Sequence, residues 1–487
     1  MNNFGTGGIR AIMGPNPDQL NVETIGKIGQ GLANYLKKYK KPTVVIGYDC
    51  RHNSPIFAAT IARVLAGNGI EVRIFNERRP TPLLSFACRH YKTKAAVMVT
   101  ASHNPREYNG IKIYGPTGGQ VTTEDKKISL EIANVKKIEI APLDHLLISW
   151  ITNELDPLYI AATKTLIQHP ELPRNLRILY SNLHGTGITL LPFCLQAWGF
   201  SPIFFVEKQK KMDGSFPYAP LPNPEEPSAL VLGTQKLLKE KMDLFLATDP
   251  DADRVGVVIR HKGKAIHLNG NQVGALLLHY LLHLGKKVPP SATCIKTLVT
   301  TDLLEEIAKG YPFFTVFTGF KHIAKKMGSC DFFFGAEESC GYLAGRFVQD
   351  KDGISASCLI AEMALYAKTH NKTLYDLLLS LYKQHGVFRE KLVTLPVSNH
   401  PFRDHFPKNI AGKKVVASED FLPQTDLLRL TLENGSKIVI RPSGTEAKMK
   451  VYLSAKKKYS PFAIKELDRH LDSLQKAVEK LCCAISR

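Results

Sequence analysis

The chain has 487 residues, of which 44% are hydrophobic, and a formal net charge of +20 at pH 7. At about 100–200 residues per domain, this length predicts three or four domains. The longest apolar stretch, around Ala275–Leu284, is too short to span a bilayer and contains His279 and His283, which excludes an integral membrane protein and predicts a soluble one.

The charge pattern indicates which kinds of partner the protein can bind, and the cysteine content indicates the cellular compartment in which it is expected. Basic residues are mostly spread through the chain in short runs such as KKYKK and AKKKY, and are not interleaved with aromatic residues along one extended segment. This favours a basic solvated surface over a nucleic-acid-binding face. The nine cysteines form no CxxC pair, and the N-terminal MNNFGTGGIR lacks a signal-peptide layout. We therefore expect a cytoplasmic protein that binds neither nucleic acid nor a membrane.

An apolar strand, a helical pattern, a glycine and a second strand follow one another three times. The expected strands occupy residues 43–49 and 70–75, then 176–182 and 200–208, then 292–299 and 311–317. Gly69, Gly199 and Gly310 stand where each helix would give way to a strand, as left-handed C-caps do. Strands that alternate with helices indicate βαβ units, so the sequence predicts three similar α/β domains.

The C-terminal part predicts a smaller α+β domain. Two apolar strands flank Asn434-Gly435, a dipeptide typical of hairpin turns, and an amphipathic helix begins near Phe462. A similar turn signal, Lys262-Gly263, closes an earlier hairpin. The predicted fold class is therefore α/β, with three βαβ-type domains and a C-terminal α+β domain. The expected domains span residues 1–172, 173–267, 268–389 and 390–487.

A serine and a histidine stand side by side after an apolar strand. The stretch VTASHNPREYNG, residues 99–110, follows the run Ala95–Val99 and contains Ser102 and His103. Ligands of open α/β sheets bind beyond the carboxyl ends of strands, where a serine next to an imidazole can act as a nucleophile or carry a covalent group. The GxSxG frame of a hydrolase elbow is absent. A Ser/Asn-rich turn before Pro105 is the alternative interpretation.

Three aspartates alternate in ATDPDADRVGVV, residues 247–258. An extended backbone would point the carboxylates of Asp249, Asp251 and Asp253 to one side, where they would repel one another unless a cation lay among them. Oxygen ligands without His or Cys suit Mg²⁺, and the Gly and Glu of a calcium EF-hand loop are missing. The pattern predicts a magnesium site, with a solvated acidic turn as the alternative.

Paired acids also follow an apolar strand in FGAEESCGY, residues 334–342. Glu337 and Glu338, with Ser339 next to them, can form hydrogen bonds to a polyhydroxylated ligand. Acidic residues at a helix N-terminus explain the pattern equally well.

The stretch RPSGTEAK combines the groups that bind oxyanions. Arg441 offers a planar fork to a phosphate, and Ser443, Gly444 and Thr445 form a small loop whose N–H groups can surround an oxyanion. Together with Lys448, these residues favour an anion-binding loop over a plain surface turn.

The motifs TASHNP, DPDADR, EES and RPSGTE, in this order, resemble those of the phosphoglucomutase/phosphomannomutase family, the α-D-phosphohexomutases. The resemblance covers essentially the whole chain. The run GAEESCGYLAGRFVQDKDGISA is most similar to the bacterial phosphoglucomutase branch that relates to phosphopentomutases. The family resemblance implies four domains around a central cleft, to which each domain contributes one loop. It also implies that the protein is an intramolecular phosphotransferase of the isomerase class.

The resemblance also implies a role for each motif. Ser102 would carry a phosphoryl group and, with Asp249, Asp251 and Asp253, would hold Mg²⁺. The basic residues expected near the transferring phosphoryl group are Arg10, His103, Lys112 and Lys351, of which His103 and Lys351 are candidates for acid–base work. The residues expected to bind substrate are Arg254, Thr318, Gly319, Lys321, Glu337, Ser339, Arg441, Ser443, Gly444 and Thr445.

The implied reaction transfers a phosphoryl group from phosphoserine to the free hydroxyl of a sugar phosphate. The resulting bisphosphate turns around, and its other phosphate returns to Ser102. Room for this turn requires a mobile fourth domain, so we expect a hinge near Glu390–Thr394.

The sugar loop bears on substrate choice. It contains EES where many relatives have EMSGH, which favours glucose over mannose, and Ser339 stands where phosphopentomutases often have Ala. We therefore expect interconversion of α-D-glucose 1-phosphate and glucose 6-phosphate, with Mg²⁺ and with glucose 1,6-bisphosphate as activator and intermediate. The alternatives are phosphomannomutase or phosphopentomutase activity, or a non-catalytic sugar-phosphate-binding protein. Both a monomer and a dimer are compatible with the sequence.

Overall fold

The computed structural model describes residues 7–396, 407–442 and 448–485, the last four of these by their backbone only. The chain divides into two compact units. The first consists of the residues up to Thr297 together with Gly310–Tyr375, and the second of Leu298–Lys309 together with the residues from Asp376 onward. Each unit is described by itself.

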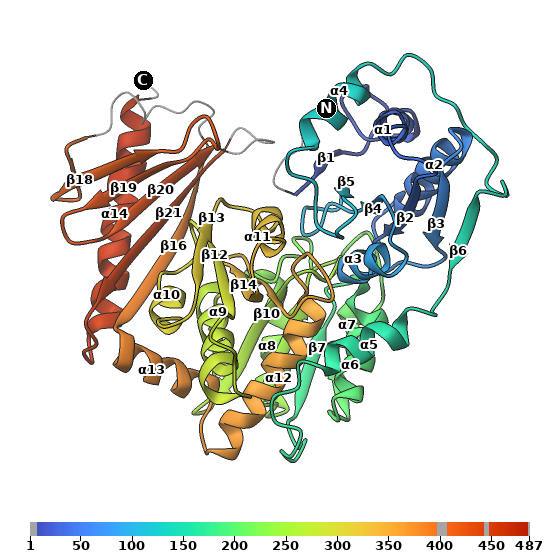
Figure 1. The fold of residues 1–487 in the computed structure, drawn as a ribbon. Coiled ribbons are helices and arrows are strands. Elements are labelled where there is room, and N and C mark those ends of the chain that lie inside the picture. The colour runs from blue at the N-terminus through green and yellow to red at the C-terminus, as the bar shows by residue number, and fades with distance from the viewer. Residues whose placement is uncertain (1–6, 397–406, 443–447, 486–487) are drawn as a thin grey trace. The chain divides into compact units, whose positions relative to one another are not determined.

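The first sheet of the first unit has six strands in the order β1-β5-β4-β2-β3-β6 (Figure 1). Strands β4, β2, β3 and β6 run parallel, whereas β1 and β5 are antiparallel to their neighbours. Helices α1, α2 and α4 share one core with the strands, and α3 packs against β2 and β4. The elements are β1 (Ile9–Ile12), α1 (Val22–Leu36), β2 (Thr43–Tyr48), α2 (Ser54–Gly67), β3 (Glu71–Phe75), α3 (Thr81–His90), β4 (Ala95–Val99), β5 (Tyr108–Tyr114), α4 (Asp125–Ala133) and β6 (Ile148–Ile151).

The second sheet has five strands in the order β11-β10-β9-β7-β8. The turn at Lys262-Gly263 joins β10 to β11 with both residues at positive φ, which confirms the predicted hairpin. The elements are α5 (Asp156–Lys164), β7 (Ile178–Ser181), a 3₁₀ turn η1 (Thr186–Thr189), α6 (Leu191–Ala197), β8 (Ile203–Phe205), α7 (Glu207–Lys210), α8 (Pro227–Lys239), β9 (Leu244–Thr248), β10 (Val255–His261) and β11 (Lys264–Leu268).

The third sheet has four strands in the order β13-β12-β14-β15. Its βαβ pair, β12 and β13, is parallel, like β2 with β3 and β7 with β8, so the three predicted units are confirmed. The elements are α9 (Gly270–His279), a π-helical turn η2 (Tyr280–Leu284), β12 (Thr293–Thr297), β13 (Phe313–Val316), α11 (Phe320–Met327), β14 (Phe332–Glu337), β15 (Gly341–Ala344) and α12 (Gly353–Thr369).

The second unit contains an antiparallel sheet in the order β16-β21-β20-β19-β18-β17, against which α14 packs. The predicted hinge at Glu390–Thr394 is wrong at this position, because these residues lie inside β16 and pair with β21 along their whole length. The elements are α10 (Leu303–Ile307), α13 (Leu374–His385, whose first two residues belong to the first unit), β16 (Val387–Leu395), β17 (Asn409–Ile410), β18 (Lys413–Asp420), β19 (Leu428–Leu432), β20 (Lys437–Pro442), β21 (Met449–Lys457) and α14 (Ala463–Ile485).

Local sequence explains why several of these helices begin where they do. Asn21 caps α1, because its side chain accepts a hydrogen bond from Thr24 N while the Thr24 hydroxyl accepts one from Asn21 N. Proline occupies the first or second position of five helices, where no intrahelical N–H is needed: α2, α3, α5, α6 and α8.

The central strands of the first unit are buried along their length and end at polar loops. Every residue of β4 and β9 is buried, as expected of parallel strands covered by helices on both faces. Ser102 follows β4, Asp249 follows β9, and Glu337 ends β14. Three of the predicted motifs thus lie at carboxyl ends of strands, where open α/β sheets bind ligands.

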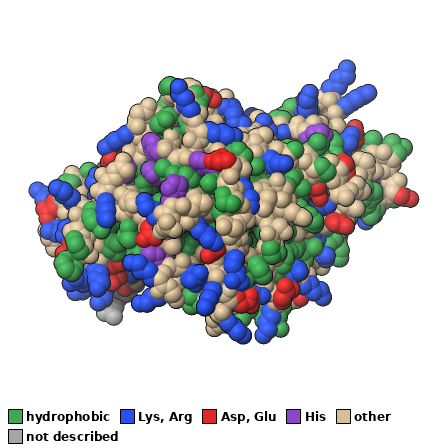
Figure 2. Space-filling model, turned by 90° about the horizontal axis from the view of Figure 1, so that it is seen from below, with side chains coloured by type: hydrophobic (Ala, Val, Ile, Leu, Met, Phe, Trp, Pro, Cys, Tyr) green, Lys and Arg blue, Asp and Glu red, His purple; other side chains and the backbone are tan. Residues whose placement is uncertain are grey.

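The surface agrees with a dispersed positive charge. On the face in Figure 2, Lys and Arg side chains are scattered among acidic and apolar ones. Within the described parts of the chain, no helix combines the length and the apolar character needed to cross a membrane.

Candidate active site

Ser102 is held in an unusual backbone conformation at the start of the loop after β4. Its φ is +52° and its side chain is 1% exposed. The Ser102 N–H donates to Thr100 Oγ1 over 2.8 Å, and its hydroxyl donates to Asp249 Oδ2 over 2.7 Å. The His103 Nδ1 atom lies 3.1 Å from the same hydroxyl oxygen. A non-glycine residue at such a φ costs about 1–3 kcal/mol, so other contacts must hold the loop.

Arg51 supplies those contacts from the loop after β2. Its Nη2 donates to the carbonyl oxygens of Ser102 and Asn104, each at 2.5 Å. Its Nη1 donates to the carbonyl oxygens of Pro105 and Tyr108, at 2.8 and 3.0 Å. One buried guanidinium therefore fixes the backbone of the whole Ser102 loop.

Asp49 anchors this arrangement from the other side. Its carboxylate accepts hydrogen bonds from the hydroxyls of Thr100 and Ser54, at 2.6 and 2.8 Å, and from the Arg51 N–H at 2.9 Å. Burial raises the pKa of Asp49, and the nearby Arg51 charge opposes the rise. Asp49 and Arg51 thus form a buried ion pair beneath the loop, with Nε and Oδ2 3.4 Å apart.

The three aspartates converge, but through a turn. The prediction of an extended backbone is wrong: residues 249–254 form the tight connection between β9 and β10, and Ala252 has a φ of +53°. Within the turn, the Arg254 N–H donates to Asp249 Oδ1 over 3.0 Å. One carboxylate oxygen each of Asp249, Asp251 and Asp253 lies within 4.8 Å of the others, and all three residues are buried.

Two lysines lie against this acidic cluster. Lys112, on β5, donates to Asp251 Oδ2 over 2.5 Å and to Asp253 Oδ2 over 2.7 Å. Lys351 Nζ lies 3.0 Å from Asp253 Oδ2. Burial alone would raise the pKa of Asp251, yet the charge and hydrogen bond of Lys112 outweigh it and the pKa falls. Burial, together with Asp253 and Asp251, raises the pKa of Asp249 well above its usual value.

The acidic cluster fits a divalent cation. The Oδ1 atoms of Asp251 and Asp253 are buried and have no hydrogen-bond partner among the described residues, an arrangement that is costly without a further positive charge. An all-oxygen donor set of carboxylates is typical of Mg²⁺. The cluster can therefore hold a metal through these oxygens and Asp249.

Several other predicted residues lie around the same cluster. Arg10 Nη1 donates to Asn104 Oδ1 over 2.6 Å, which joins β1 to the Ser102 loop. Arg254 Nη1 lies 2.5 Å from Glu225 Oε1, and its Nε lies 3.9 Å from Asp253 Oδ1. The structure thus brings together eight predicted residues: Arg10, Ser102, His103, Lys112, the three aspartates and Arg254, with Lys351 as the ninth.

Glu337 lies next to Lys351 at the end of β14. Its side chain is buried, and burial raises its pKa to about 7, although Lys351 and Arg254 act in the opposite direction. Gly341 stands opposite Glu337 in the β14–β15 hairpin, and a Cβ there would lie 2.5 Å from Lys351 Cδ. The glycine therefore leaves the room in which Lys351 reaches the site. Ser339 is half-buried in the turn of this hairpin.

The TGFKH segment lies at the start of α11. Gly319 precedes the helix with a φ of +112°, a conformation that favours glycine. The Thr318 hydroxyl is buried with no hydrogen-bond partner among the described residues. Lys321 Nζ lies 3.6 Å from Asp125 Oδ2. Thr318 and Gly319 thus offer a donor and a backbone turn, whereas Lys321 forms an ion pair within the protein.

The predicted phosphate loop is described only at its edges. Arg441 is half-buried near the end of β20 in the second unit. Ser443, Gly444 and Thr445 lie outside the described residues, so their role stays a prediction.

Sequence reasoning missed the residues that support the loops. Arg51, Thr81 and Glu225 contact predicted residues directly, and the Thr81 hydroxyl donates to Asp251 Oδ2 over 2.6 Å. Asp49 acts at one remove, through Thr100 and Arg51. A signal was present for two of them: in IGYDCRHNS an acidic and a basic residue follow a buried strand directly, which is typical of a buried ion pair.

Comparison with known proteins agrees with this geometry. Sequence models of phosphoglucomutase/phosphomannomutase alpha/beta/alpha domains I, II and III match residues 1–139, 157–263 and 269–385. A phosphoglucomutase from Staphylococcus haemolyticus (strain JCSC1435) is 37% identical over 499 aligned residues, which cover 93% of this chain and 90% of that protein. A phosphoglucomutase from Staphylococcus aureus (strain USA300) is 35% identical, with 93% and 89% covered.

The fold has solved counterparts. A protein from Thermus thermophilus assigned as a phosphomannomutase superposes with a TM-score of 0.79 at 25% identity, covering 98% of both chains. A family protein from Burkholderia thailandensis superposes with a TM-score of 0.74 at 20% identity, covering 98% of this chain and 97% of that one.

Three α/β domains, a β-rich C-terminal domain and an acidic metal loop define an isomerase-type enzyme, a phosphohexomutase. The chain belongs to the phosphoglucomutase/phosphomannomutase family, the α-D-phosphohexomutases.

Proposed function

We propose that this protein is a phosphoglucomutase that interconverts α-D-glucose 1-phosphate and glucose 6-phosphate through a phosphoserine at Ser102. The observation that carries the proposal is the contact between the Ser102 hydroxyl and the acidic metal loop, 2.7 Å to Asp249 Oδ2. Curated relatives at 35–37% identity, which are phosphoglucomutases, support glucose as the sugar.

In the proposed first step, the free hydroxyl oxygen of the sugar phosphate attacks the phosphorus of phosphorylated Ser102. A new P–O bond to the sugar forms, the P–Oγ bond to Ser102 breaks, and glucose 1,6-bisphosphate results. The attacking hydroxyl loses its proton to a base, and Ser102 Oγ takes up one. His103, whose Nδ1 lies 3.1 Å from Oγ, is placed to give that proton. Burial lowers the pKa of Lys351, the other acid–base candidate, but Asp253, Asp350 and Glu337 outweigh burial and raise it. Lys351 therefore stays an ammonium and is placed to offset phosphoryl charge.

The second step is the reverse transfer from the other end of the sugar. The bisphosphate turns around and its second phosphoryl group returns to Ser102, which leaves the isomeric monophosphate. Charge on the phosphoryl oxygens is the main electrostatic demand of both steps. Lys112, Lys351, Arg10 and Arg254 surround the loop and can offset it. Mg²⁺ bound at the three aspartates would supply further positive charge.

Each unit offers predicted substrate-binding residues of its own. Glu337, Ser339, Thr318 and Gly319 offer acceptors and donors to the sugar hydroxyls, with Lys321 beside them. Arg441 with residues 443–445 would hold the non-reacting phosphate and so orient either end of the sugar. A cytoplasmic location and the domain division given above stay predictions of the sequence.

Turnover assays test this proposal. Purified protein is assayed with glucose 1-phosphate, Mg²⁺ and a trace of glucose 1,6-bisphosphate, beside mannose 1-phosphate and ribose 1-phosphate. We expect preference for glucose and loss of turnover in Ser102→Ala, while the exposed Ser329→Ala keeps it. Full activity of Ser102→Ala would refute the phosphoserine. A preference for mannose 1-phosphate or ribose 1-phosphate would show that the substrate is not glucose phosphate. Absence of turnover with all three sugar phosphates would favour a non-catalytic sugar-phosphate-binding protein.

A further inference from the structure

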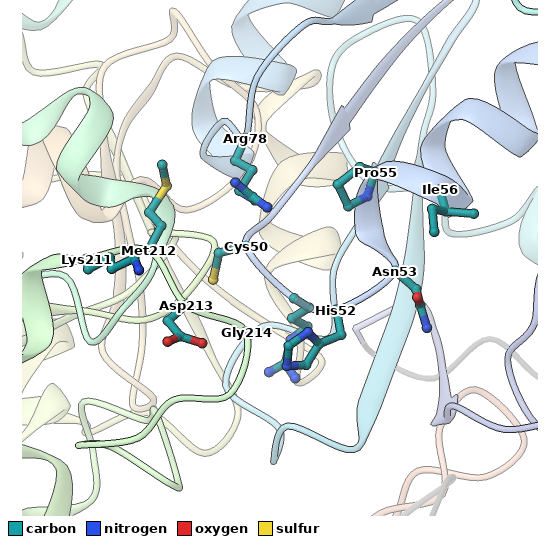
Figure 3. A pocket seen from close by; sticks show the side chains of 11 residues that line it. Cys50, His52, Asn53, Pro55, Ile56, Arg78, Lys211, Met212, Asp213 and Gly214 are labelled. Carbon is teal, nitrogen blue, oxygen red and sulfur yellow. The ribbon is translucent and has the colours of Figure 1, made fainter.

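A cavity lies beyond the carboxyl ends of β2 and β3. It has a volume of about 400 Å³ and is lined by residues 50–53 and 55–56, by Arg78, and by residues 211–214 of the loop after α7 (Figure 3). Cavities of this size accommodate small molecules. None of the three aspartates, Ser102 or His103 lines it, so it is separate from the candidate active site.

Most of the charged side chains that line this cavity are basic. Arg78 follows β3 and Lys211 follows α7, so the two charges come from loops that are far apart in the sequence. Both side chains are exposed, and neither donates a hydrogen bond or forms an ion pair within the described parts of the chain. His52 adds an imidazole whose Nε2 lies 2.9 Å from Ser215 Oγ. Asp213 is the acidic residue of the lining, and its Oδ1 is engaged with the Ser215 N–H at 2.8 Å.

The N-terminus of α2 adds to this positive potential. Asn53 and Pro55 line the cavity at the start of this 14-residue helix. Asn53 does not cap the helix with its side chain, and donates instead to Met13 Sδ at 3.7 Å. A helix N-terminus carries a partial positive charge and favours anions. Together with Arg78 and Lys211, it makes the cavity complementary to a compact anion.

We propose that this cavity binds a small phosphomonoester dianion and that its occupancy affects the Ser102 loop. A guanidinium fork and an ammonium group suit the several oxygens of a phosphate better than a single carboxylate. The carboxyl ends of parallel strands are also where α/β sheets place such ligands. The binding part of this inference is independent of the function proposed above, whereas the effect on turnover rests on it.

Arg51 links the cavity to the active site. The residue lines the cavity, and its guanidinium holds the carbonyl oxygens of Ser102 and Asn104. Gly214 packs against the same segment so closely that a Cβ there would lie 2.6 Å from His52 N and 2.8 Å from Cys50 O. A ligand between residues 50–53 and 211–214 therefore contacts the segment that positions the nucleophile loop.

Isothermal titration calorimetry with glycerol 3-phosphate tests whether the cavity binds a phosphomonoester. The proteins compared are the wild type, Arg78→Gln, Lys211→Gln and, as a matched control, Arg177→Gln, which removes an exposed arginine outside the cavity. In Arg78→Gln and in Lys211→Gln, we expect the affinity of one class of binding sites for glycerol 3-phosphate to fall by about tenfold or more, because a charge-assisted hydrogen bond is lost. The Arg177→Gln isotherm should match the wild type. Equal isotherms for all four proteins would overturn the proposal.

Turnover of glucose 1-phosphate with added glycerol 3-phosphate tests the coupling. The probe should change the turnover of the wild type and of Arg177→Gln, and Arg78→Gln should lose that response while keeping its basal rate. The same response in Arg78→Gln would place the effect in the active site and overturn the coupling. Because the titration needs no turnover, a protein without mutase activity would still show whether the cavity binds the phosphomonoester.

Discussion

The Ser102 hydroxyl and the Asp249 carboxylate form a direct hydrogen bond of 2.7 Å, although 147 residues separate them and they follow strands of two different sheets. The contact depends on two residues in the left-handed region of φ, Ser102 and Ala252, one in each loop. It places the proposed nucleophile against the carboxylate cluster that can hold a metal. The first prediction follows from that cluster.

Removing the metal, or one of its proposed ligands, should abolish turnover. Asp251 Oδ1 is a buried oxygen without a hydrogen-bond partner among the described residues. The Asp251→Asn variant therefore loses a ligand and a charge, and we expect turnover to fall by about two orders of magnitude or more. Chelation of the wild type should have the same effect and Mg²⁺ should reverse it. Undiminished activity after exhaustive chelation, checked by elemental analysis, would contradict the magnesium assignment.

Loss of the Arg51 guanidinium should destabilise the first unit strongly. Arg51→Met leaves Asp49 buried without its counter-charge and four carbonyl oxygens without their donor. Breaking a buried pair costs about 3–5 kcal/mol, so thermal denaturation should show a marked fall in Tm. Arg106→Met removes an exposed partner of Glu107 and serves as control, with an expected cost below about 1 kcal/mol. Similar Tm values for the two variants would show that the buried pair has no structural role.

We expect Glu337 to make the free energy of unfolding depend on pH, in the range between the ordinary pKa of a glutamate and the pKa of Glu337 in the folded protein. Burial raises the pKa from 4.5 to about 7, so the folded protein binds a proton that the unfolded chain has released. The carboxyl therefore favours the folded state below pH 4.5, and this contribution is lost as the pH rises toward 7. The stability of Glu337→Gln relative to wild type should increase from pH 4.5 to 7.5, as followed by urea denaturation. Exposed Glu305→Gln should show no such trend.

Gly214→Ala should destabilise the protein, because the added Cβ would meet rigid backbone. Its nearest atoms would be His52 N at 2.6 Å and Cys50 O at 2.8 Å. Overpacking of this kind costs about 1–3 kcal/mol. Gly115 has no atom within 4 Å of such a Cβ and is a matched control, since its φ is not in the left-handed region. If calorimetry gave equal Tm values for both alanine variants, the close packing of residues 50–52 against Gly214 would be refuted.

Much of the fold could be predicted because it depends on local patterns. Apolar runs and glycines such as Gly69 and Gly199 mark where strands and helices meet, and the structure has parallel pairs at all three predicted places. The candidate site could be predicted where one short motif contains its chemistry, as at Ser102 and Asp249. The roles of these residues stay predictions.

Other features could not be predicted, because they depend on distant segments meeting. Nothing local to Thr81 indicates its hydrogen bond with Asp251, 170 residues away. The alternation of the aspartates indicated an extended strand, whereas a residue with positive φ, Ala252, turns the chain and makes the carboxylates converge. The position expected for a hinge looked like a join between domains in the sequence, yet its backbone is paired along β16.

The hold of Arg51 on four carbonyl groups of one loop has a mechanical consequence for the proposed reaction. A loop tied through Ser102, Asn104, Pro105 and Tyr108 to one guanidinium has few soft torsions left. The backbone at Ser102 is therefore held in place, and the side-chain torsion is the main freedom left to the serine oxygen. The reorientation that presents the second phosphate to this loop must then be made by the sugar and by parts of the protein outside the loop, so the duration of a cycle includes the rotation of a small molecule beside a fixed backbone.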